Sequence, residues 1–371
     1  MYTIKMGELS GLIEKHWPSK QPLLVFGPYG CAKSAIVRQT SERIAQNKFP
    51  KRKFIDWADT TNEQKESIIE NPEKYFVFTD QRISQMDSTD LRGIPNMMNK
   101  DMLQTVPYSW VIYFTKPEAA GFIFFDEINL AAPIVAGSAY QIILDRCISD
   151  RRLGSEVYIC AAGNRQTDKA YTFDMPRPLK DRFTEVEITV DFDGWSAWAS
   201  ANGVSSHILA FLNWQNSWLY KTNEKGTDKD ATPRGWTRAS KLIEGYDVTS
   251  NDVHQLISIS VGEAAASVFK AYCKHFKSIN WDQIFKNPEM IKGWESDKMF
   301  AVTGGLVDQF AKEPKLDMFR KVLKVCEHMP TEFMVITLRM CWRTKPAEAR
   351  ECMKQAKEFK SLAEVFGKFV V

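Results

Sequence analysis

Short and nearly continuous hydrophobic runs alternate with longer amphipathic stretches through the first 190 residues of the chain. Runs with the length and composition of buried strands lie at residues 23–26, 75–80, 122–125, 157–162 and 186–190. A helical stretch at residues 35–47 follows the first run closely. Apolar strands separated by helices are typical of a parallel sheet covered on both faces. The pattern therefore predicts an α/β fold for this part of the chain.

The second half of the chain loses these strand signals and shows helical periodicity instead. Helices are predicted at residues 233–244 and 252–276, and further helices fill the remainder. The polar segment 221–233, which contains Gly226 among charged residues, predicts a loop. At about 150 residues per domain, a chain of 371 residues has room for two or three domains. We divide it into an α/β core at 1–190, a helical lid at 191–278 and a C-terminal helical region at 279–371.

Composition excludes several classes of protein. Hydrophobic residues make up 44% and charged residues 26%, which is ordinary for a soluble globular protein and unlike a disordered or fibrous chain. No window approaches 18 uninterrupted apolar residues, so no membrane span is expected, and the first residues lack the apolar core of a signal peptide. These features predict a cytoplasmic protein, of a bacterial cell or a cell infected by a phage.

Charge and cysteine content argue against a nucleic-acid binder, a disulfide-stabilised protein and a zinc protein. The 49 basic and 46 acidic residues nearly cancel and no basic stripe is visible, so a dedicated nucleic-acid binder is not favoured. The seven cysteines are scattered and include no CxxC pair, which argues against a disulfide framework and against a zinc site. Reduced thiols in core and surface positions are the simpler interpretation.

The strongest local signal is a glycine-containing loop between the first predicted strand and the helix that follows it. The loop consists of Gly27, Pro28, Tyr29, Gly30, Cys31, Ala32, Lys33 and Ser34, and Ala35 continues into the helix. Gly27 and Gly30 allow close approach of the backbone to phosphate oxygens, and the helix N-terminus adds partial positive charge. Lys33 would contact the β- and γ-phosphates of ATP, and Ser34 would ligate Mg²⁺.

Two residues of this loop are unusual. The usual pattern has glycine before the lysine, and Ala32 stands there instead; alanine suits this helix start if its φ is negative. Cys31 lies inside the loop, where oxidation or alkylation of its thiol would block ATP. For the motif taken alone, a chance strand–turn–helix that contains a lysine is the alternative.

An acidic pair follows the third predicted strand, where four apolar residues lead directly into Asp126 and Glu127. A buried strand presents such carboxylates at its C-terminal end, which is where α/β sheets bind ligands. Asp126 is predicted to hold Mg²⁺, and Glu127 to act as general base toward the attacking water. A solvated acidic turn is common in isolation, but a pair about 90 residues after a phosphate-binding loop favours the functional interpretation.

Three further polar residues complete the candidate site. Asn164 follows the fourth strand, where it would orient the attacking water or touch the γ-phosphate; a turn-forming asparagine is the competing interpretation. Arg182 precedes the last strand, and an arginine supplied by a neighbouring subunit can neutralise charge during phosphoryl transfer. Arg234 begins the helix predicted at 233–244 and could contact the γ-phosphate. For both arginines, a solvated surface residue is the competing interpretation.

Taken in order, these motifs resemble those of the AAA+ ATPases. Residues 27–34 resemble Walker A, Asp126 and Glu127 resemble Walker B, Asn164 resembles sensor 1, Arg182 the arginine finger and Arg234 sensor 2. Within that family the chain looks most like the MoxR-like and dynein-related ATPases of prokaryotic or phage type. Residues 124–131 resemble their DEINxA segment, residues 87–95 resemble the segment after their second strand, and residues 161–165 are similar to ATxNP except that Arg165 replaces proline.

The resemblance, which covers residues 20–245, carries implications of its own. It implies a P-loop AAA+ core followed by an α-helical lid, with ATP and Mg²⁺ bound. It also implies a homo-oligomeric ring, often a hexamer, with ATP between subunits, so that Arg182 acts on the neighbouring subunit and Arg234 on its own. Chaperone-like remodelling of a protein client is implied as well, often with a partner that bears a von Willebrand factor A-type domain.

Other functions stay open on the sequence alone. A DNA- or RNA-associated motor or helicase-loader-type ATPase is the main alternative. Arg151 and Arg152 are the better candidate for a pore-facing basic site, although a turn with a solvated arginine pair is the favoured interpretation of these two residues. The predicted lid holds a cluster of tryptophans, which we interpret as helix-packing core rather than as a base-stacking surface: Trp195, Trp198, Trp214, Trp218 and Trp236. A non-hydrolysing scaffold fits the complete acidic pair less well, and a small-substrate kinase fits Asn164 and Arg234 less well.

Overall fold

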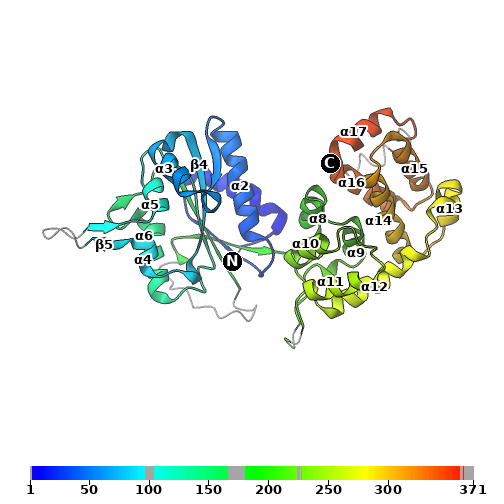
Figure 1. The fold of residues 1–371 in the computed structure, drawn as a ribbon, viewed down its shortest axis with the longest axis horizontal. Coiled ribbons are helices and arrows are strands. Elements are labelled where there is room, and N and C mark those ends of the chain that lie inside the picture. The colour runs from blue at the N-terminus through cyan, green and yellow to red at the C-terminus, as the bar shows by residue number, and fades with distance from the viewer. Residues whose placement is uncertain are drawn as a thin grey trace. The chain divides into compact units, whose positions relative to one another are not determined.

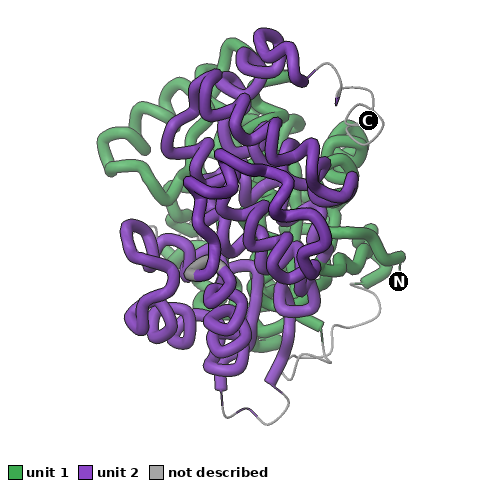
Figure 2. The backbone as a smooth tube through the Cα atoms, turned by 90° about the vertical axis from the view of Figure 1, so that its right-hand side faces the viewer, with its two compact units in different colours: residues 1–190 green, residues 191–371 purple. Residues whose placement is uncertain are grey.

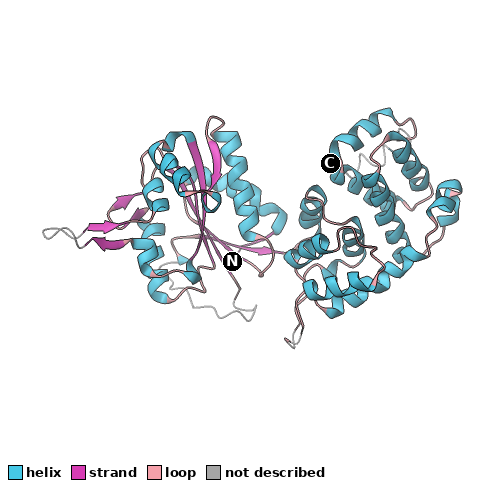
Figure 3. Ribbon diagram, in the orientation of Figure 1, coloured by secondary structure: helices cyan, strands magenta, loops and turns pink. Residues whose placement is uncertain are grey.

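The computed structural model describes residues 2–96, 104–165, 180–223, 226, 228–359 and 362. The chain forms two compact units, residues 1–190 and residues 191–371 (Figure 1, Figure 2). The first unit is a seven-stranded sheet with helices on both faces, and the second is built mainly from helices (Figure 3). The predicted fold class, an α/β core followed by a helical region, is confirmed.

The sheet of the first unit is parallel throughout. Across the sheet the strands are β1 (Tyr2–Lys5), β11 (Thr184–Thr189), β2 (Leu23–Phe26), β10 (Glu156–Gly163), β7 (Ala120–Asp126), β4 (Tyr75–Arg82) and β3 (Lys53–Asp56). Each of the five predicted strands overlaps one of them. Because β10 lies between β2 and β7, the strand before the glycine-containing loop, the strand before Asn164 and the strand of the acidic pair end side by side.

The hydrophobic pattern misses β1 and β3, which form the two edges of the sheet. Only Ile4 is buried in β1, and β3 has an exposed first residue followed by half-buried ones. An edge strand pairs on one side only and can carry polar and charged side chains. These two strands therefore lack the apolar run that marks the central strands.

Helices cover both faces of this sheet. One face carries α1 (Leu9–His16) and α2 (Lys33–Lys48), with the Trp17 ring stacked on Phe122 at a centroid separation of 5.0 Å. On the other face, Ile123 and Phe125 pack into a core with residues of the neighbouring helices. These helices are α3 (Asn62–Glu70), α5 (Ser109–Phe114) and α6 (Pro133–Asp145), with the short α4 (Ser88–Arg92) against α6 (Figure 1).

Two small hairpins extend from the first unit. One pairs β5 (Ile94–Asn96) with β6 (Gln104–Val106), and the other pairs β8 (Cys147–Ile148) with β9 (Arg151–Arg152). Ser149, in the turn of the second hairpin, donates a hydrogen bond to the carbonyl oxygen of Arg92 at 2.9 Å. This contact ties the second hairpin to α4.

Among the residues described, the second unit has ten α-helices and two short 3-10 helices, Asn216–Trp218 and Pro288–Ile291. The α-helices are α8 (Phe192–Ala201), α9 (Ser206–Trp214), α10 (Pro233–Leu242), α11 (Asn251–Val261), α12 (Glu263–Lys277), α13 (Trp281–Lys286), α14 (Ser296–Lys312), α15 (Leu316–Cys326), α16 (Thr331–Thr344) and α17 (Pro346–Gln355). Helix α14 packs against α9, α12 and α16. The division at residue 278 stays a prediction. No helix in the described ranges is long and apolar enough to cross a membrane.

The single helix predicted at residues 252–276 is wrong, because the structure has two helices there. They meet at Gly262, whose φ is +90°. A Cβ atom at this position would lie 2.4 Å from the carbonyl oxygen of Lys229. The Asp228 carboxylate accepts a hydrogen bond from the Glu263 backbone N–H at 2.7 Å, which satisfies the start of α12. The hydrophobic periodicity continues through the break and conceals it.

Two of the five tryptophans in the predicted cluster lie in the core of the second unit, and the other three are half-buried. Trp195 and Trp236 are fully buried, and Trp236 lies 5.5 Å from Phe211 between ring centroids. The indole N–H of Trp236 donates to the carbonyl oxygen of Trp218 at 2.7 Å. The prediction of helix-packing core is confirmed for these two residues, which leaves neither ring available for base stacking.

Candidate active site

The glycine-containing loop connects β2 to α2 in the position that the sequence predicts. Gly30 has a φ of +70° and Ala32 a φ of +64°, and α2 begins at Lys33. The condition under which alanine suits this helix start, a negative φ, is therefore not met. A non-glycine residue in the left-handed region costs about 1–2 kcal/mol, so Ala32 holds strain that a glycine would relieve. Gly27 is also required by space, because a Cβ atom there would lie 2.5 Å from Cγ1 of Ile188.

The Lys33 ammonium group lies inside this loop with 7% of the residue exposed. Its Nζ donates to the carbonyl oxygens of Gly27 at 2.8 Å and Pro28 at 3.0 Å. It also donates to Oδ1 of Asn164 at 3.3 Å, across 131 residues of sequence. The structure thus brings the predicted phosphate-binding lysine and the predicted sensor asparagine into direct contact.

Ser34 and Asp126 form the second contact between distant motifs. The Ser34 hydroxyl donates to Oδ2 of Asp126 at 2.6 Å, although 92 residues separate them. The other carboxylate oxygen of Asp126 accepts from the backbone N–H of Glu127 at 2.9 Å. A serine hydroxyl and a carboxylate at the end of a buried strand are oxygen donors of the kind that Mg²⁺ prefers.

Glu127 is positioned by its backbone and by a residue that the sequence analysis did not identify. Its φ of +56° lies in the left-handed region, which directs the chain sharply away from β7. The Ser84 hydroxyl, in the turn Ile83–Gln85 after β4, donates to Oε2 of Glu127 at 2.5 Å. Ser84 lies 43 residues earlier in the chain. Only the neighbouring positions of β4 and β7 bring these two residues together.

A second missed residue, Asn129, fixes Asn164 in place. The Asn129 side-chain amide donates to the carbonyl oxygen of Asn164 at 2.7 Å, and its Oδ1 accepts from the Asn164 backbone N–H at 3.0 Å. Asn129 is 7% exposed, so both bonds are shielded from water. These two bonds connect the loop after β7 to the end of β10 and leave the Asn164 side chain facing Lys33.

Asp80, on β4, is a further carboxylate at this edge of the sheet that no sequence motif marks. Its Oδ1 is buried and has no hydrogen-bond partner. Burial, followed by the negative charge of Asp126, raises the pKa of Asp80 to about 6. Asp56, one strand further, differs because its Oδ2 accepts from Nε of Arg38 at 2.6 Å. Among the described residues at this end of the sheet, Asp80 is therefore a carboxylate with a buried oxygen that lacks a hydrogen-bond partner.

The expectation that the Cys31 thiol is a reactive site in the loop is wrong. Cys31 is 1% exposed, and its Sγ donates to the carbonyl oxygen of Pro28 at 2.8 Å. Burial raises the pKa of Cys31 above its ordinary value. A thiol that is both buried and protonated is inert toward oxidants and alkylating reagents, since the thiolate is the reactive form.

Arg182 and the glycine-containing loop lie at opposite ends of their strands. It is exposed and lies just before β11, and the register pairs Thr184 of β11 with Leu23, the first residue of β2. The loop follows the last residue of β2, so Arg182 lies at the N-terminal ends of the parallel strands and the loop lies at their C-terminal ends. This placement does not allow Arg182 to reach the loop of its own chain, and a role in a neighbouring subunit stays a prediction.

Arg234 lies in the second unit, in the first turn of α10. Thr232 caps this helix by accepting a hydrogen bond from the Gly235 backbone N–H at 3.0 Å, and Arg234 is exposed. Its predicted contact with the γ-phosphate stays a prediction. Of the motif residues, the structure brings together Lys33, Ser34, Asp126, Glu127 and Asn164.

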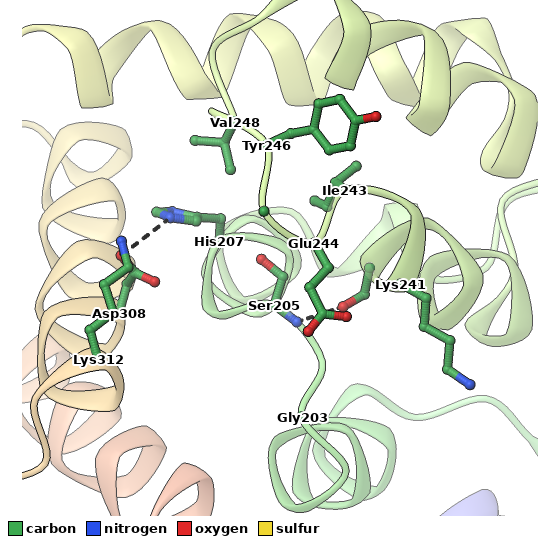
Figure 4. A pocket seen from close by; sticks show the side chains of 12 residues that line it. Gly203, Ser205, His207, Lys241, Ile243, Glu244, Tyr246, Val248, Asp308 and Lys312 are labelled. Carbon is green, nitrogen blue, oxygen red and sulfur yellow. Dashed lines mark hydrogen bonds and ion pairs between the residues drawn. The ribbon is translucent and has the colours of Figure 1, made fainter.

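The second unit contains a cavity of about 410 Å³ between the start of α9, the end of α10 and α14 (Figure 4). Asp308 lies on one wall, with its Oδ2 at 2.8 Å from Nζ of Lys312 and 4.0 Å from Nε2 of His207. Ser205 donates its backbone N–H to Oγ of Ser240 at 2.8 Å. Asp308 is thus engaged by His207 and Lys312, and Ser205 by Ser240. The exposed Lys241 and Glu244 of the lining carry opposite charges, so the cavity does not define a class of ligand.

Comparison with known proteins assigns no family. No family model matches the chain, and no curated protein matches it. Among solved structures, NtrX from Brucella abortus in complex with ADP has a TM-score of 0.30 at 13% identity, covering 98% of this chain and 68% of that one. The Aeropyrum pernix ORC2 protein has a TM-score of 0.37 at 11% identity, covering 81% and 74%. Similarity at this level does not identify a function.

Proposed function

We propose that this protein binds ATP with Mg²⁺ and hydrolyses it to ADP and phosphate. The observation that carries the proposal is the convergence of three motifs at one edge of the sheet. Lys33 contacts Asn164 at 3.3 Å, and Ser34 contacts Asp126 at 2.6 Å. Both contacts join polar side chains, so packing of the hydrophobic core does not explain them. Each joins residues about 90 or more positions apart in sequence.

The residues present fit a magnesium site. Ser34 Oγ and Asp126 Oδ2 would hold the ion, directly or through water, and Asp80 Oδ1 is an orphaned buried oxygen beside them. When bound, Mg²⁺ neutralises charge on the phosphate oxygens. The chain itself supplies the remaining groups, since the Lys33 ammonium binds the β- and γ-phosphates once it leaves the carbonyl oxygens of Gly27 and Pro28.

Glu127 is proposed as the general base that accepts the proton of the attacking water. Its carboxylate is held by Ser84, and the Asn129 bonds hold Asn164 so that its side chain orients the water. Arg182 of a neighbouring subunit and Arg234 are proposed to stabilise charge on the transferred phosphoryl group. The proposal includes the implications of the resemblance: an AAA+ ATPase of the MoxR-like type that forms a ring, often hexameric, and remodels a protein client.

Direct measurement of ATP binding and turnover tests the proposal. We expect Lys33→Ala to abolish ATP binding and Glu127→Gln to bind ATP with a rate of hydrolysis lower by roughly 100- to 10,000-fold. Lys48→Ala, at the exposed C-terminal end of α2, is a matched control that should keep both properties. Undiminished turnover in Glu127→Gln would remove Glu127 from its assigned role, and ATP binding by Lys33→Ala would contradict the site.

Two exposed arginines on β9 provide a test of the nucleic-acid alternative. Arg151 and Arg152 are both exposed on β9, which is held against α4 by Ser149. Two exposed arginines on a hairpin can contact a phosphate backbone. Stimulation of hydrolysis by single-stranded DNA, lost at high salt and lost in the Arg151→Ala, Arg152→Ala double variant, would favour this alternative over a protein client.

A further inference from the structure

Asp80 and Asp126 share one face of the sheet. The register pairs Asp80 of β4 with Phe124 of β7, and Arg82 with Asp126. Asp126 lies two residues beyond Phe124, and alternate residues of a strand point to the same face. With a strand spacing of about 4.8 Å and a rise of about 3.3 Å per residue, the two Cα atoms lie roughly 8 Å apart. No direct contact links the two carboxylates in the structure, because Asp126 is bonded to Ser34 and to the Glu127 backbone. Two carboxylates on residues with this Cα separation suit a bridge made by a water molecule.

The neighbours of Asp80 are satisfied where Asp80 is not. Asp126 accepts from the Ser34 hydroxyl, and Asp56, on the other side of Asp80, accepts from Arg38. The Oδ1 atom of Asp80 is buried without a hydrogen-bond partner. A buried acceptor without a donor is unfavourable, and a bound water molecule or the water shell of an ion is one source of the missing donor.

Charge around Asp80 points to a cationic occupant. Asp126, Glu127 and Asp56 all act on it with negative charge, and Arg82, exposed on the same strand, is the one cation among the described residues that opposes them appreciably. No group of three acidic, histidine or cysteine side chains in the described ranges is close enough to hold a metal ion directly. An ion that keeps part of its water shell fits both the negative charge around Asp80 and the absence of a direct set of ligands. Mg²⁺ usually keeps several waters.

We propose that Asp80 is a positioning residue for the magnesium ion of the proposed ATP site, accepting a hydrogen bond from water in the coordination shell of the ion. The inference rests on the proposed function, because it assumes that Ser34 and Asp126 hold the ion. Asp80 would orient the water shell and add to the affinity for the ion without ligating it. Residues in this outer position commonly contribute about 10- to 100-fold in metal affinity.

The test measures the Mg²⁺ requirement of ATP binding in the full chain. ATP affinity is followed by calorimetry over a Mg²⁺ series and in EDTA for wild type, Asp80→Asn and Asp56→Asn. Asp80→Asn removes the charge at nearly constant size, and we expect it to raise the Mg²⁺ concentration for half-maximal binding about tenfold. Its ATP affinity in EDTA should be equal to or above that of wild type, because one negative charge near the phosphates is gone.

Asp56→Asn is the matched control, since Asp56 is a carboxylate on the same sheet face whose oxygen already has Arg38 as partner. It should keep the wild-type Mg²⁺ requirement. A Mg²⁺ requirement of Asp80→Asn within twofold of wild type overturns the inference, as does an equal shift in both variants. If Asp80→Asn does not fold, Asp80→Ser is measured in its place, with the same expected shift.

The ATP site and the role of Asp80 are tested by different outcomes of this experiment. Wild-type protein that binds no ATP at any Mg²⁺ concentration contradicts the proposed function and the inference with it. Wild-type protein that binds ATP in a Mg²⁺-dependent way, with an Asp80→Asn variant that matches it, contradicts the role of Asp80 alone.

Discussion

The hydroxyl of Ser34, at the start of α2, donates a hydrogen bond to the carboxylate of Asp126, at the end of β7, over 2.6 Å. The pair joins the loop after one strand to the acidic end of another, with β10 between the two strands. Both residues are half-buried, and their oxygen atoms could ligate a metal ion. They lie at the C-terminal ends of the strands, where ligands bind in α/β folds. Their contact is the structural basis of the proposed magnesium site.

Ser34→Ala removes one of the two predicted ligands while the loop keeps its backbone. We expect the Mg²⁺-dependent rate of ATP hydrolysis to fall roughly 10- to 100-fold, with only about 1 kcal/mol lost from the free energy of unfolding. Steady-state turnover and urea unfolding measure the two quantities. Ser34→Thr keeps the hydroxyl and should retain most of the activity; an Ala variant as active as wild type would argue against Ser34 as a ligand.

Ser84→Ala removes the hydroxyl that holds the Glu127 carboxylate at 2.5 Å. Because a general base must be correctly placed to accept a proton, we expect kcat to fall about tenfold while the affinity for ATP stays unchanged. Pre-equilibrium ATP binding and initial rates separate the two effects. A rise in kcat would mean that Ser84 restrains Glu127 instead of positioning it.

Ala32→Gly restores the usual residue before the lysine. Ala32 has a φ of +64°, which glycine adopts without strain, although glycine also loses more entropy on folding. The net effect should be a gain of about 0.5–1 kcal/mol in the free energy of unfolding, with ATP binding retained. Chemical denaturation measures the gain. Destabilisation by this substitution would contradict the left-handed conformation at Ala32.

Asp80 gives the α/β unit a defined dependence on pH. Burial and Asp126 raise its pKa from 3.8 to about 6, so between these values the folded state holds a proton that the unfolded state has lost. This contribution to stability is present in full below pH 3.8 and is lost as the pH rises through about 6. Asp80→Asn cannot ionise, and in EDTA we expect it to unfold roughly 2–4 °C above wild type at pH 8.

Well below pH 3.8 the melting temperatures of wild type and Asp80→Asn should converge, since Asp80 is then neutral in both states of the wild type. Scanning calorimetry across this range checks the sign. A variant that is less stable than wild type at pH 8 would show that the Asp80 carboxylate has a stabilising partner.

Arg182 is expected to act on the site of a neighbouring subunit. Arg182→Ala should bind ATP normally and hydrolyse it roughly 1,000-fold more slowly. Mixing it with Glu127→Gln should recover about a quarter of the wild-type rate, because one interface in four then combines both intact residues. Lys180→Ala, an exposed cation two residues earlier, is the control that should remain active. Mixed oligomers without recovered activity would contradict the assignment.

The central strands and the loop could be predicted because their signals are local. A buried strand in a two-sided sheet must be apolar throughout, so β2, β7 and β10 stand out in the sequence. The glycine-containing loop is marked by its residue types and its place between strand and helix. Edge strands such as β3 carry no such signal, because they form by pairing with one neighbouring strand. The break at Gly262 carries none either, because it depends on a single backbone angle.

The sequence by itself determined the α/β class, the loop at residues 27–34 and the acidic pair at Asp126. Only the tertiary structure decided which side chains meet: Ser84 with Glu127, Asn129 with Asn164, and Asp80 beside Asp126 without a partner for its buried oxygen. Those relationships depend on strand order and register, which bring together residues far apart in the chain. Hydrophobic periodicity encodes which face of a strand is buried, but not which strand lies next to it.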